Sequence, residues 1–292
     1  MTFDIATVTF DLEYPMLELQ ARSIEKRFSA DLGKIILINN SNSNIDYCRP
    51  WYGKFADRVE IHHISEVVSN HNINSYGNQM IAKIKLSKYC TSENIILLDN
   101  KNWLINSVSE NKIIKENKLA GGSGGIGQEW ELQWKNSLEL FDLNTNDHPY
   151  TKYSARTPFF VKTHTLLELL SLFDDIESKI LSGEYTEFSL VNAYIIKKYH
   201  SWHNYFFDYD PECSIETGLW PGYRQDLSTV VDRLYGYDYN RQYRTLVTGV
   251  HRRVWNTLTE EEKNSLAEIW SNQGILSYQS GLNLIQNMCN LN

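Results

Sequence analysis

Asp99 and Lys101 are the residues whose types and spacing most clearly permit chemistry. They belong to the stretch NIILLDNKNW at 94–103, in which an apolar run ends in a carboxylate and an ammonium follows two positions later. In open parallel sheets, ligands bind at the carboxyl ends of strands. A strand that ends at Asp99 would project its carboxylate into that crevice, and the nearby ammonium would favour the ionised form. We therefore expect a polar site at this point of the chain; an ordinary strand-end carboxylate paired with Lys101 is the alternative.

A second group of possible anion ligands lies in the stretch TGVHRRVW near the C-terminus. His251 is placed just beyond an expected strand, and Arg252 and Arg253 follow it. A guanidinium can hold a phosphate group through two parallel N–H bonds, so either arginine could bind one. This is the densest concentration of anion-binding groups in the sequence. A basic surface patch is the alternative interpretation.

Tyr76, Gln79 and Lys83 are spaced so that they share one face of an expected helix. Such a face could offer an aromatic ring to a base and an ammonium to a phosphate. The alternative is a solvated helix face, and for Lys83 alone this alternative is favoured.

Three residues at the end of the first expected strand could meet a ligand. Thr9 and Asp11 offer hydrogen bonds, and the ring of Phe10 could stack. An ordinary turn between a strand and a helix would contain similar residues, so this alternative stays open.

Glu187 stands at the beginning of an expected helix, directly after Thr186, a residue suited to cap it. A carboxylate near an acceptor group can serve as a general base. A helix N-terminus favours the ionised carboxylate, which weakens a base, so a glutamate that complements the helix dipole is the alternative. Glu184 and Asp210 are the other candidates for a base.

Strand and helix patterns alternate over the first hundred residues and predict the elements that position these side chains. Apolar residues at helical spacing predict helices that follow Pro15 and cover 76–89. Strands that alternate with helices imply an α/β fold with a mostly parallel, Rossmann-like sheet, flanked by helices and joined by right-handed crossovers. The β-branched and apolar runs predict strands at 5–10, 34–39, 58–64 and 94–99.

The second half of the chain is less regular and more helical. The glycine-rich stretch at 120–130 is either a linker between domains or a loop over a site. Thr165 with Glu168, and Thr259 with Glu262, have the spacing of capping boxes that open helices. The pattern also predicts a strand within 154–164, a helix at 186–199 and a strand that ends at Val250. We divide the chain into 1–120 and 121–292, which are expected to form one continuous domain.

Composition excludes several classes of protein. The 292 residues carry a net charge of -8, with a mean hydropathy of -0.43 and no apolar run near the roughly 20 residues that span a bilayer. The N-terminus lacks a basic segment and reads as a strand, not as a signal peptide. Acidic charge disfavours broad binding to nucleic acid. The four cysteines have no paired spacing, which indicates reduced thiols and a cytoplasmic location.

Aromatic and histidine-rich stretches are open to two interpretations. His200 and His203 could bind zinc on one helix, but no second pair of ligands stands nearby, so zinc is discounted. His62 and His63 alternate in a strand and should point in opposite directions. Large aromatic residues after Tyr199 could line an acceptor groove, although most are expected in the core; they are Trp202, Tyr205, Phe206, Phe207, Trp220 and Tyr223.

Three stretches resemble nucleotide-diphospho-sugar transferases of the GT-A type. They are TVTFDLEYPMLELQARSI near the N-terminus, LLDNKN around Asp99, and TEFSLVNAYI around Glu187. The resemblance covers most of the chain and is closest to a little-characterised family found in bacteria and phages. It implies a GT-A-like fold, with a nucleotide-sugar-binding half at 1–120 and an acceptor-binding half at 121–292.

The resemblance also implies a reaction and a set of residues. A sugar would pass from a nucleoside-diphosphate sugar, with UDP favoured, to a hydroxyl of a glycan or other acceptor, with inversion favoured. Glu187 would be the general base, and Asp99 would take part in catalysis. The donor-binding residues would be Thr9, Phe10, Asp11, Tyr76, Gln79, Lys83, Asp99, Asn100, Lys101, His251 and Arg252.

The triplet that begins at Asp99 differs at one position from the usual metal-binding motif of such enzymes, and this difference bears on whether a metal is needed. In such enzymes two Asp separated by one residue usually hold Mn²⁺ or Mg²⁺, which neutralises the departing diphosphate. Here the triplet is Asp99-Asn100-Lys101, so a lysine replaces the second acid. Asp99 and His251 are the implied metal ligands. Catalysis without a metal is equally consistent with the triplet, because Lys101 could supply part of the positive charge.

Two other functions are compatible with the sequence. A catalytically inactive nucleotide-sugar or glycan-binding protein of the same fold is favoured by the missing second acid. A nucleotidyltransferase ranks last, because TFDLEYP has no glycine with which to form a phosphate loop. A DNA acceptor is possible but disfavoured by the acidic charge.

Overall fold

The protein is described here by a computed structural model. It describes residues 1–69, 72, 75–122, 127–150, 153, 155–209, 215–219 and 245–291. Asp210, Trp220 and Tyr223, which the sequence puts forward as candidate site residues, lie outside the described residues.

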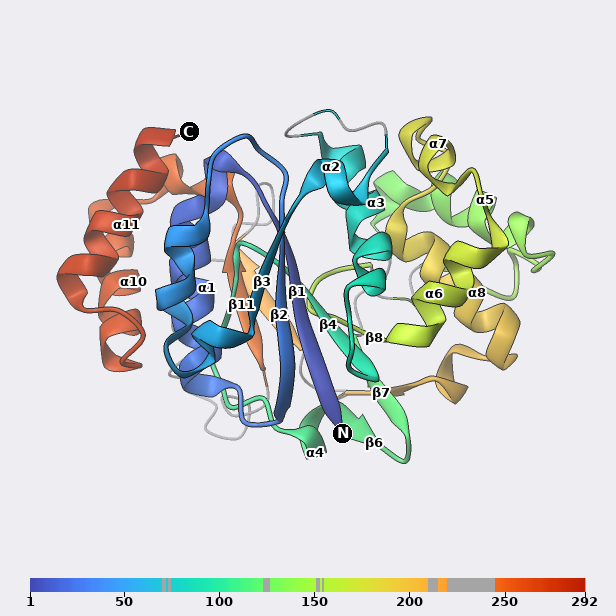
Figure 1. The fold of residues 1–292 in the computed structure, drawn as a ribbon, viewed down its shortest axis with the longest axis horizontal. Helices are drawn as coiled ribbons and strands as arrows, with labels where there is room; N and C mark the ends of the chain where they lie inside the picture. The colour runs from blue at the N-terminus through green and yellow to red at the C-terminus, as the bar shows by residue number, and fades with distance from the viewer. Residues whose placement is uncertain are drawn as a thin grey trace.

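A mostly parallel sheet of five strands forms the centre of the fold, in the order β3-β2-β1-β4-β8 (Figure 1). The first four strands run parallel and β8 is antiparallel to β4. This confirms the predicted α/β fold class with a mostly parallel sheet. The strands are β1 (Thr2–Thr9), β2 (Asp31–Asn39), β3 (Val59–His63), β4 (Asn94–Asp99) and β8 (Phe159–Lys162).

Helices cover both faces of this sheet (Figure 1). On one side, α1 (Tyr14–Arg27) is followed outward by α10 (Glu260–Asn272) and α11 (Tyr278–Leu291). On the other side lie α3 (Tyr76–Lys85), α6 (Thr163–Leu172) and α8 (Glu187–Tyr199). The other α-helices within the described ranges are α2 (Ile64–Val67), α4 (Glu110–Ile113), α5 (Glu131–Leu140) and α7 (Ile176–Leu181).

Two smaller sheets extend the central one. The first has the order β10-β11-β5 and contains β5 (Asn102–Leu104), β10 (Glu216–Leu219) and β11 (Val247–Val250). The second has the order β6-β7-β9 and contains β6 (Ile114–Lys115), β7 (Lys118–Gly121) and β9 (Phe206–Asp208). Because β4 ends at Asp99 and β5 begins at Asn102, the chain passes from the central sheet to the first small sheet within one turn.

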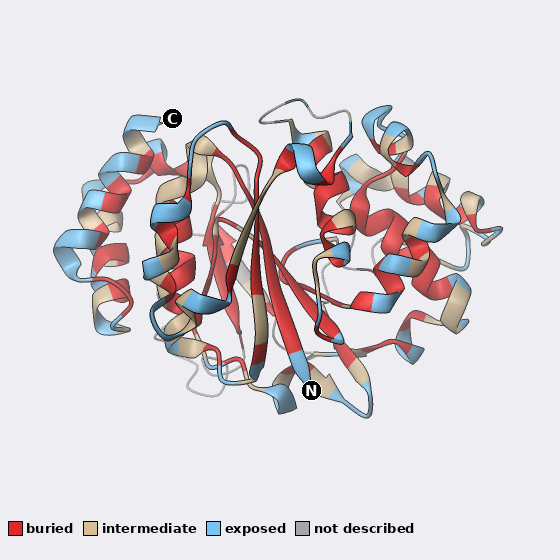
Figure 2. Ribbon diagram, viewed as in Figure 1, coloured by how far each residue is buried: buried red, intermediate tan, exposed pale blue. Residues whose placement is uncertain are grey.

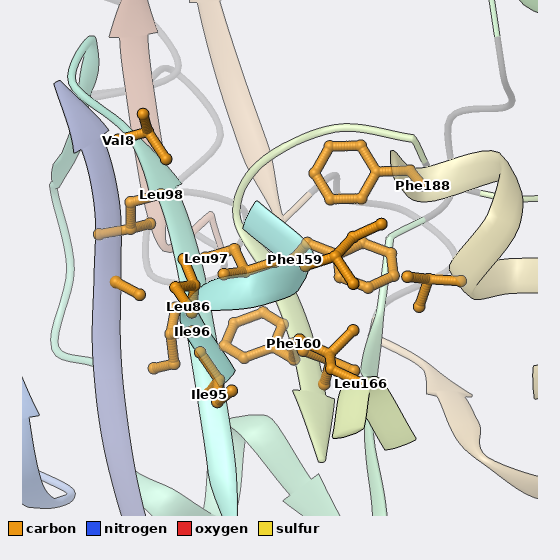
Figure 3. Packing of buried hydrophobic residues seen from close by; sticks show 14 of the residues in the cluster. Val8, Leu86, Ile95, Ile96, Leu97, Leu98, Phe159, Phe160, Leu166 and Phe188 are labelled. Carbon is orange, nitrogen blue, oxygen red and sulfur yellow. The ribbon is translucent and has the colours of Figure 1, made fainter. Parts of the chain in front are cut away.

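Buried apolar side chains fill the centre of the molecule, and exposed residues concentrate on the outer faces of the helices (Figure 2). Leu97 of β4 is opposite Phe159 of β8, whose ring centre lies 4.7 Å from that of Phe188 of α8 (Figure 3). The large cluster to which these residues belong draws on both predicted halves of the chain. A second cluster joins α1, through Met16 and Leu19, to α10 and α11.

The predicted aromatic core is confirmed where it is described. Trp202, Tyr205 and Phe206 are each at most 4% exposed, so they belong to the core and do not line an open groove. Phe207 is half-buried.

The helix starts are partly as predicted. Thr186 and Thr259 cap α8 and α10 through their side chains, as expected. The predicted capping box of Thr165 with Glu168 is wrong, because α6 already begins at Thr163. There the Thr163 N–H donates to the carbonyl of Glu93 and its hydroxyl to the carbonyl of Ser92, tertiary contacts that local sequence does not reveal. Glu168 instead accepts a hydrogen bond from Tyr194.

Candidate functional site

The ends of three parallel strands bring polar residues to one edge of the central sheet. In the register of β1 with its neighbours, Val8 is opposite Asp99 and Thr9 is opposite Asn39. The carboxyl ends of β1, β2 and β4 therefore stop at the same level. In open α/β sheets this edge is where ligands bind.

The turn after β4 is fixed from several sides. The Asp99 N–H donates to the side-chain oxygen of Asn102 (2.8 Å), and the buried amide of Gln20 donates to the carbonyls of Asp99 (2.7 Å) and Asn102 (3.1 Å). The side-chain amide of Asn100 donates to the hydroxyl of Thr9. The sequence marks Thr9 and Asn100 as donor-binding, and here they bond each other and hold the turn against β1.

Lys83 is the centre of a buried ionic network. Its ammonium lies 2.8 Å from Oδ1 of Asp99 and 3.1 Å from Oε1 of Glu187, and Lys83 and Glu187 are 6% and 3% exposed. The ammonium of Lys101 lies 2.5 Å from Oδ2 of Asp99. The interpretation of Lys83 as part of a solvated helix face is wrong, because α8 packs over this face of α3 and brings Glu187 to it.

The charges in this network shift the pKa values of Asp99 and Lys83. Burial alone would raise the pKa of Asp99, but the ammonium groups of Lys101 and Lys83 outweigh it and hold that pKa well below its ordinary value. Burial would lower the pKa of Lys83, but Asp99 and Glu187 raise it above its ordinary value. Asp99 is therefore a carboxylate and Lys83 an ammonium at neutral pH.

The cationic residues of the C-terminal stretch lie beside this network. Strand β11 pairs antiparallel with β5, with Gly249 opposite Asn102, so His251 follows directly beside the turn. Burial first, and then the charges of Lys101, Arg253 and Arg252, lower the pKa of His251 to about 4, so its imidazole is neutral at pH 7. The guanidinium of Arg252 lies 5.9 Å from the ring centre of Phe10.

Asp11 and Phe10 begin the turn from β1 into α1. One carboxylate oxygen of Asp11 is buried with no hydrogen-bond partner among the described residues. The side-chain oxygen of Asn100 is also buried with no hydrogen-bond partner among the described residues, and Asn100 as a whole is 1% exposed. Buried acceptors without a partner are costly, so these two oxygens are places where donors of a ligand could bind.

Tyr76 and Gln79 share the face of α3 that carries Lys83, as predicted. Tyr76 is 54% exposed and Gln79 is half-buried. The ring of Tyr76 stacks on that of Trp130, with centroids 6.2 Å apart and planes 27° apart.

Sequence reasoning missed two carboxyl groups of the site. Burial raises the pKa of Glu13 to about 7, while the charge of Lys101 opposes the rise and that of Asp99 adds to it. Burial likewise raises the pKa of Glu216 to about 7, with the same two charges acting on it. Glu13 was visible in the turn after β1 but had no special spacing. Glu216 reaches the site only through the pairing of β10 with β11, for which no local signal exists.

The sequence assigns Asp99 and His251 as ligands of a divalent ion. Asp99 already contacts ammonium groups with both carboxylate oxygens. In the part of the chain that the structure describes, no group of three His, Cys, Asp or Glu could hold a metal ion. The assignment of Asp99 and His251 as ligands of Mn²⁺ or Mg²⁺ stays a prediction.

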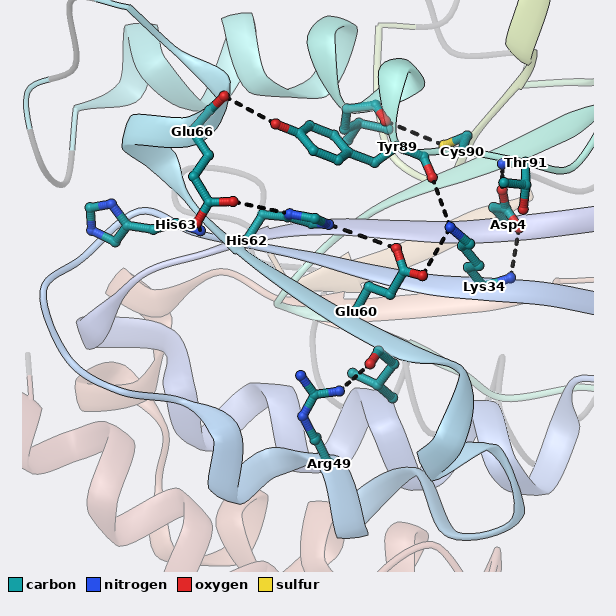
Figure 4. Close-up of polar contacts among 12 residues, drawn as sticks. Asp4, Lys34, Arg49, Glu60, His62, His63, Glu66, Tyr89, Cys90 and Thr91 are labelled. Atoms are coloured by element: carbon teal, nitrogen blue, oxygen red, sulfur yellow. Dashed lines mark hydrogen bonds and ion pairs between the residues drawn. The ribbon is translucent and has the colours of Figure 1, made fainter.

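Strand β3 ends at His63, which is opposite Asn39 of β2, so His62 and His63 lie at the same edge of the sheet. His62 contacts Glu60 and Glu66, while His63 points the other way and caps α2 (Figure 4). Glu184, an alternative base, is exposed and accepts a hydrogen bond from Ser182. No helix in the described ranges is both long and apolar enough to cross a membrane.

Comparisons with known proteins give fold likeness only. No protein-family model and no curated protein sequence matches this chain. Among solved structures, a galactosyltransferase, LgtC, in complex with donor and acceptor sugar analogs is 12% identical with a TM-score of 0.49, over 85% of this chain and 86% of that one. The glycosyltransferase GlyE of Streptococcus pneumoniae is 12% identical with a TM-score of 0.48, over 96% of this chain and 62% of that one. Mouse xyloside xylosyltransferase 1 is 7% identical with a TM-score of 0.46, over 85% of this chain and 97% of that one.

By name, all three are glycosyltransferases. Their identities and TM-scores are too low to carry an activity or the role of any residue over to this chain. The function is therefore derived from the side chains of the site.

Proposed function

We propose that the protein transfers a glycosyl group from a nucleoside-diphosphate sugar to an acceptor hydroxyl. One observation carries the proposal: Lys101 contacts Asp99 at the carboxyl end of β4, and His251 and Arg252 directly follow β11, the strand that pairs with β5 beside this turn. A departing diphosphate needs positive charge or hydrogen-bond donors that are already in place. Lys101 and Arg252 supply positive charge at an edge where parallel sheets bind ligands.

The nucleoside is proposed to lie along the turn after β1, with UDP the favoured nucleotide. The guanidinium of Arg252 lies over the buried ring of Phe10, which is 9% exposed, and offers its outer face for a base to stack on. The free carboxylate oxygen of Asp11 and the free amide oxygen of Asn100 can accept hydrogen bonds from a ribose or a base. Thr9 supports this turn through its bond with Asn100 and is not expected to touch the ligand.

The diphosphate is proposed to be neutralised without a resident metal ion. Lys101 stands where the second acid of a two-Asp motif would stand, and its ammonium is the nearest cation to Asp99. Arg252 can bind the diphosphate with two parallel N–H bonds, and neutral His251 can donate one. Lys83 lies on the other side of Asp99, where a sugar attached to the diphosphate would reach.

Glu187 is proposed as the general base of an inverting transfer. Lys83 binds its Oε1, so Oε2 is the oxygen that would take the proton of the acceptor hydroxyl. The acceptor oxygen forms a bond to the anomeric carbon while the bond from that carbon to the phosphate oxygen breaks, and the nucleoside diphosphate leaves with the electron pair. The buried ion pair fixes the carboxylate in place before the acceptor arrives.

The main alternative is a nucleotide-sugar-binding protein of the same fold without turnover. Two assays separate the alternatives. A thermal-shift screen of UDP, GDP, ADP and TDP sugars should find a stabilising ligand, since a ligand at 100 times its Kd stabilises by about 2.7 kcal/mol. The stabilising donor is then incubated with the protein in EDTA and in Mn²⁺, and the free nucleoside diphosphate is measured.

The outcomes are distinct. Release of nucleoside diphosphate in EDTA supports metal-independent transfer, and its loss in Lys101→Met supports the role of that ammonium. Stabilisation without release in either condition supports the binding protein. Failure of every donor to stabilise the chain refutes the donor site.

A further inference from the structure

Tyr76 and Trp130 form a stacked aromatic pair next to the ionic network. Tyr76 is the first residue of α3, and Trp130 ends the short 3-10 helix Gln128–Trp130. Their ring centroids are 6.2 Å apart and their planes are inclined by 27°. Tyr76 is 54% exposed, while Trp130 is half-buried against the main core. The pair is thus a flat aromatic surface that is open on the side of Tyr76 and supported from beneath by Trp130.

The position of this pair relates it to Glu187. Tyr76 lies two turns before Lys83 on the same face of α3, and Lys83 binds Glu187. Burial, and then the charge of Glu187, raises the pKa of the Tyr76 phenol well above its ordinary value. The charges that act most on His251 are instead those of Lys101, Arg253 and Arg252. Asp99 contacts Lys83, which lies on the helix face of Tyr76 and binds Glu187, with one carboxylate oxygen, and Lys101 with the other.

The chemistry around the aromatic pair favours a neutral, hydroxyl-rich ring. A phosphate-bearing ligand would meet the negative charges of Glu187 and Glu129, which both act on Tyr76, while the charge of Lys83 is already shared between Asp99 and Glu187. A purely apolar ligand would bury these charged groups without compensation. The C–H face of a pyranose can lie on an aromatic ring while its hydroxyls bond to carboxylates and to the amide of Gln79.

We propose that Tyr76 and Trp130 form the acceptor subsite, in place of the donor contact that the sequence suggested for Tyr76, and that the acceptor presents a pyranose ring. The inference rests on the proposed function, because it places the acceptor hydroxyl beside Glu187. The acceptor class is accordingly an unphosphorylated glycan, not a lipid alcohol and not a nucleic acid.

The test compares two substitutions of one exposed residue. Tyr76→Leu keeps apolar bulk but removes the flat ring, and Tyr76→Phe keeps the ring but removes the hydroxyl. Leu132→Ala is the matched control, since Leu132 is 64% exposed on the neighbouring helix α5 and lies outside the aromatic pair. Labelled protein is applied to a glycan microarray in the presence of UDP, and Kd values for a bound glycan and for UDP are measured by calorimetry.

Wild type, Tyr76→Phe and Leu132→Ala should bind the same glycans, and Tyr76→Leu should bind them roughly five- to tenfold more weakly. The Kd for UDP should be the same in all four proteins. Equal glycan affinity of Tyr76→Leu and wild type, or binding of no glycan by wild type, overturns the subsite. UDP binding in those cases leaves the donor site intact, whereas glycan binding without any nucleotide binding refutes the transferase and retains the subsite.

Discussion

Lys83 offers the sharpest test of how the site is built. Its ammonium bridges Asp99 and Glu187 and is almost completely buried. Lys83→Met keeps most of the length and removes the charge. Glu187 then loses the cation that contacts it, and breaking one side of a buried ion pair costs about 3–5 kcal/mol of unfolding free energy. For a domain of this size the melting temperature should fall by on the order of 10 °C.

The assay is urea denaturation followed by circular dichroism, at pH 8 and at pH 5. The loss should be smaller at pH 5, because a carboxyl that is buried without a partner is less costly to hold when neutral. Lys83→Met combined with Glu187→Gln should lose less than the sum of the two single variants, by about 1–3 kcal/mol of coupling.

A matched control lies two positions along the same helix. Lys85 pairs with Glu177, and both side chains are more exposed than Lys83 and Glu187. Lys85→Met should therefore cost less than Lys83→Met. Equal losses in the two variants, or a Lys83→Met protein as stable as wild type at pH 8, would refute the idea that a buried charge network holds this site.

Three further predictions concern the turn, the protons and the diphosphate. Gln20→Leu should destabilise the protein by about 2 kcal/mol in urea denaturation, because two buried carbonyls lose a donor worth about 1 kcal/mol each. Burial raises the pKa of Glu13 and of Glu216 to about 7. Between the ordinary pKa of a glutamate and pH 7, the folded protein therefore keeps these two protons while the unfolded chain has released them. The free energy of unfolding consequently falls as the pH rises towards 7. The stability gained by Glu13→Gln over wild type should therefore be larger at pH 8 than at pH 5, and an equal gain at both would contradict the assignment. Arg252→Lys should weaken UDP binding about tenfold in calorimetry, since lysine gives up the paired N–H bonds and the contact with Phe10; unchanged affinity would place the diphosphate elsewhere.

The central sheet could be predicted from the sequence because parallel strands are buried on both faces. Such strands appear as continuous apolar runs, as in β2 and β4, and their ends fall where the first polar residue appears. The position of Asp99 at a strand end follows from that pattern. Local capping also predicted the start of α8 at Glu187, because a threonine side chain and the first turn of a helix are neighbours in the chain.

The environment of Lys83 could not be predicted, because its partners come from distant parts of the chain. Glu187 follows it by 104 residues, and lysine is usually exposed, so a solvated face was the better expectation from α3 alone. Glu216 accepts a hydrogen bond from Asn102, which lies 114 residues earlier in the chain. Its position in the site depends on the pairing of β10 with β11, which no local pattern specifies. The start of α6 was predicted wrongly for the same reason. The carbonyls of Ser92 and Glu93, just before β4, accept hydrogen bonds from Thr163, and the helix begins there instead of after Thr165.

The contrast between the buried Asp4 and the partly exposed Asp99 supports the proposal that the network around Asp99 serves a ligand. Asp4 accepts hydrogen bonds from the backbone N–H groups of Lys34 (2.6 Å), Thr91 (2.7 Å) and Ser92 (2.9 Å), so the fold itself satisfies this carboxylate (Figure 4). The side chain of Asp99 is instead met by the ends of two long lysine side chains. Replacing a buried ion network with apolar residues is often neutral or stabilising, so stability alone gives little reason to keep one. Ammonium groups on flexible stems can turn from a carboxylate to an incoming phosphate, whereas backbone N–H groups cannot, and this exchange is what a site that binds and releases a diphosphate requires.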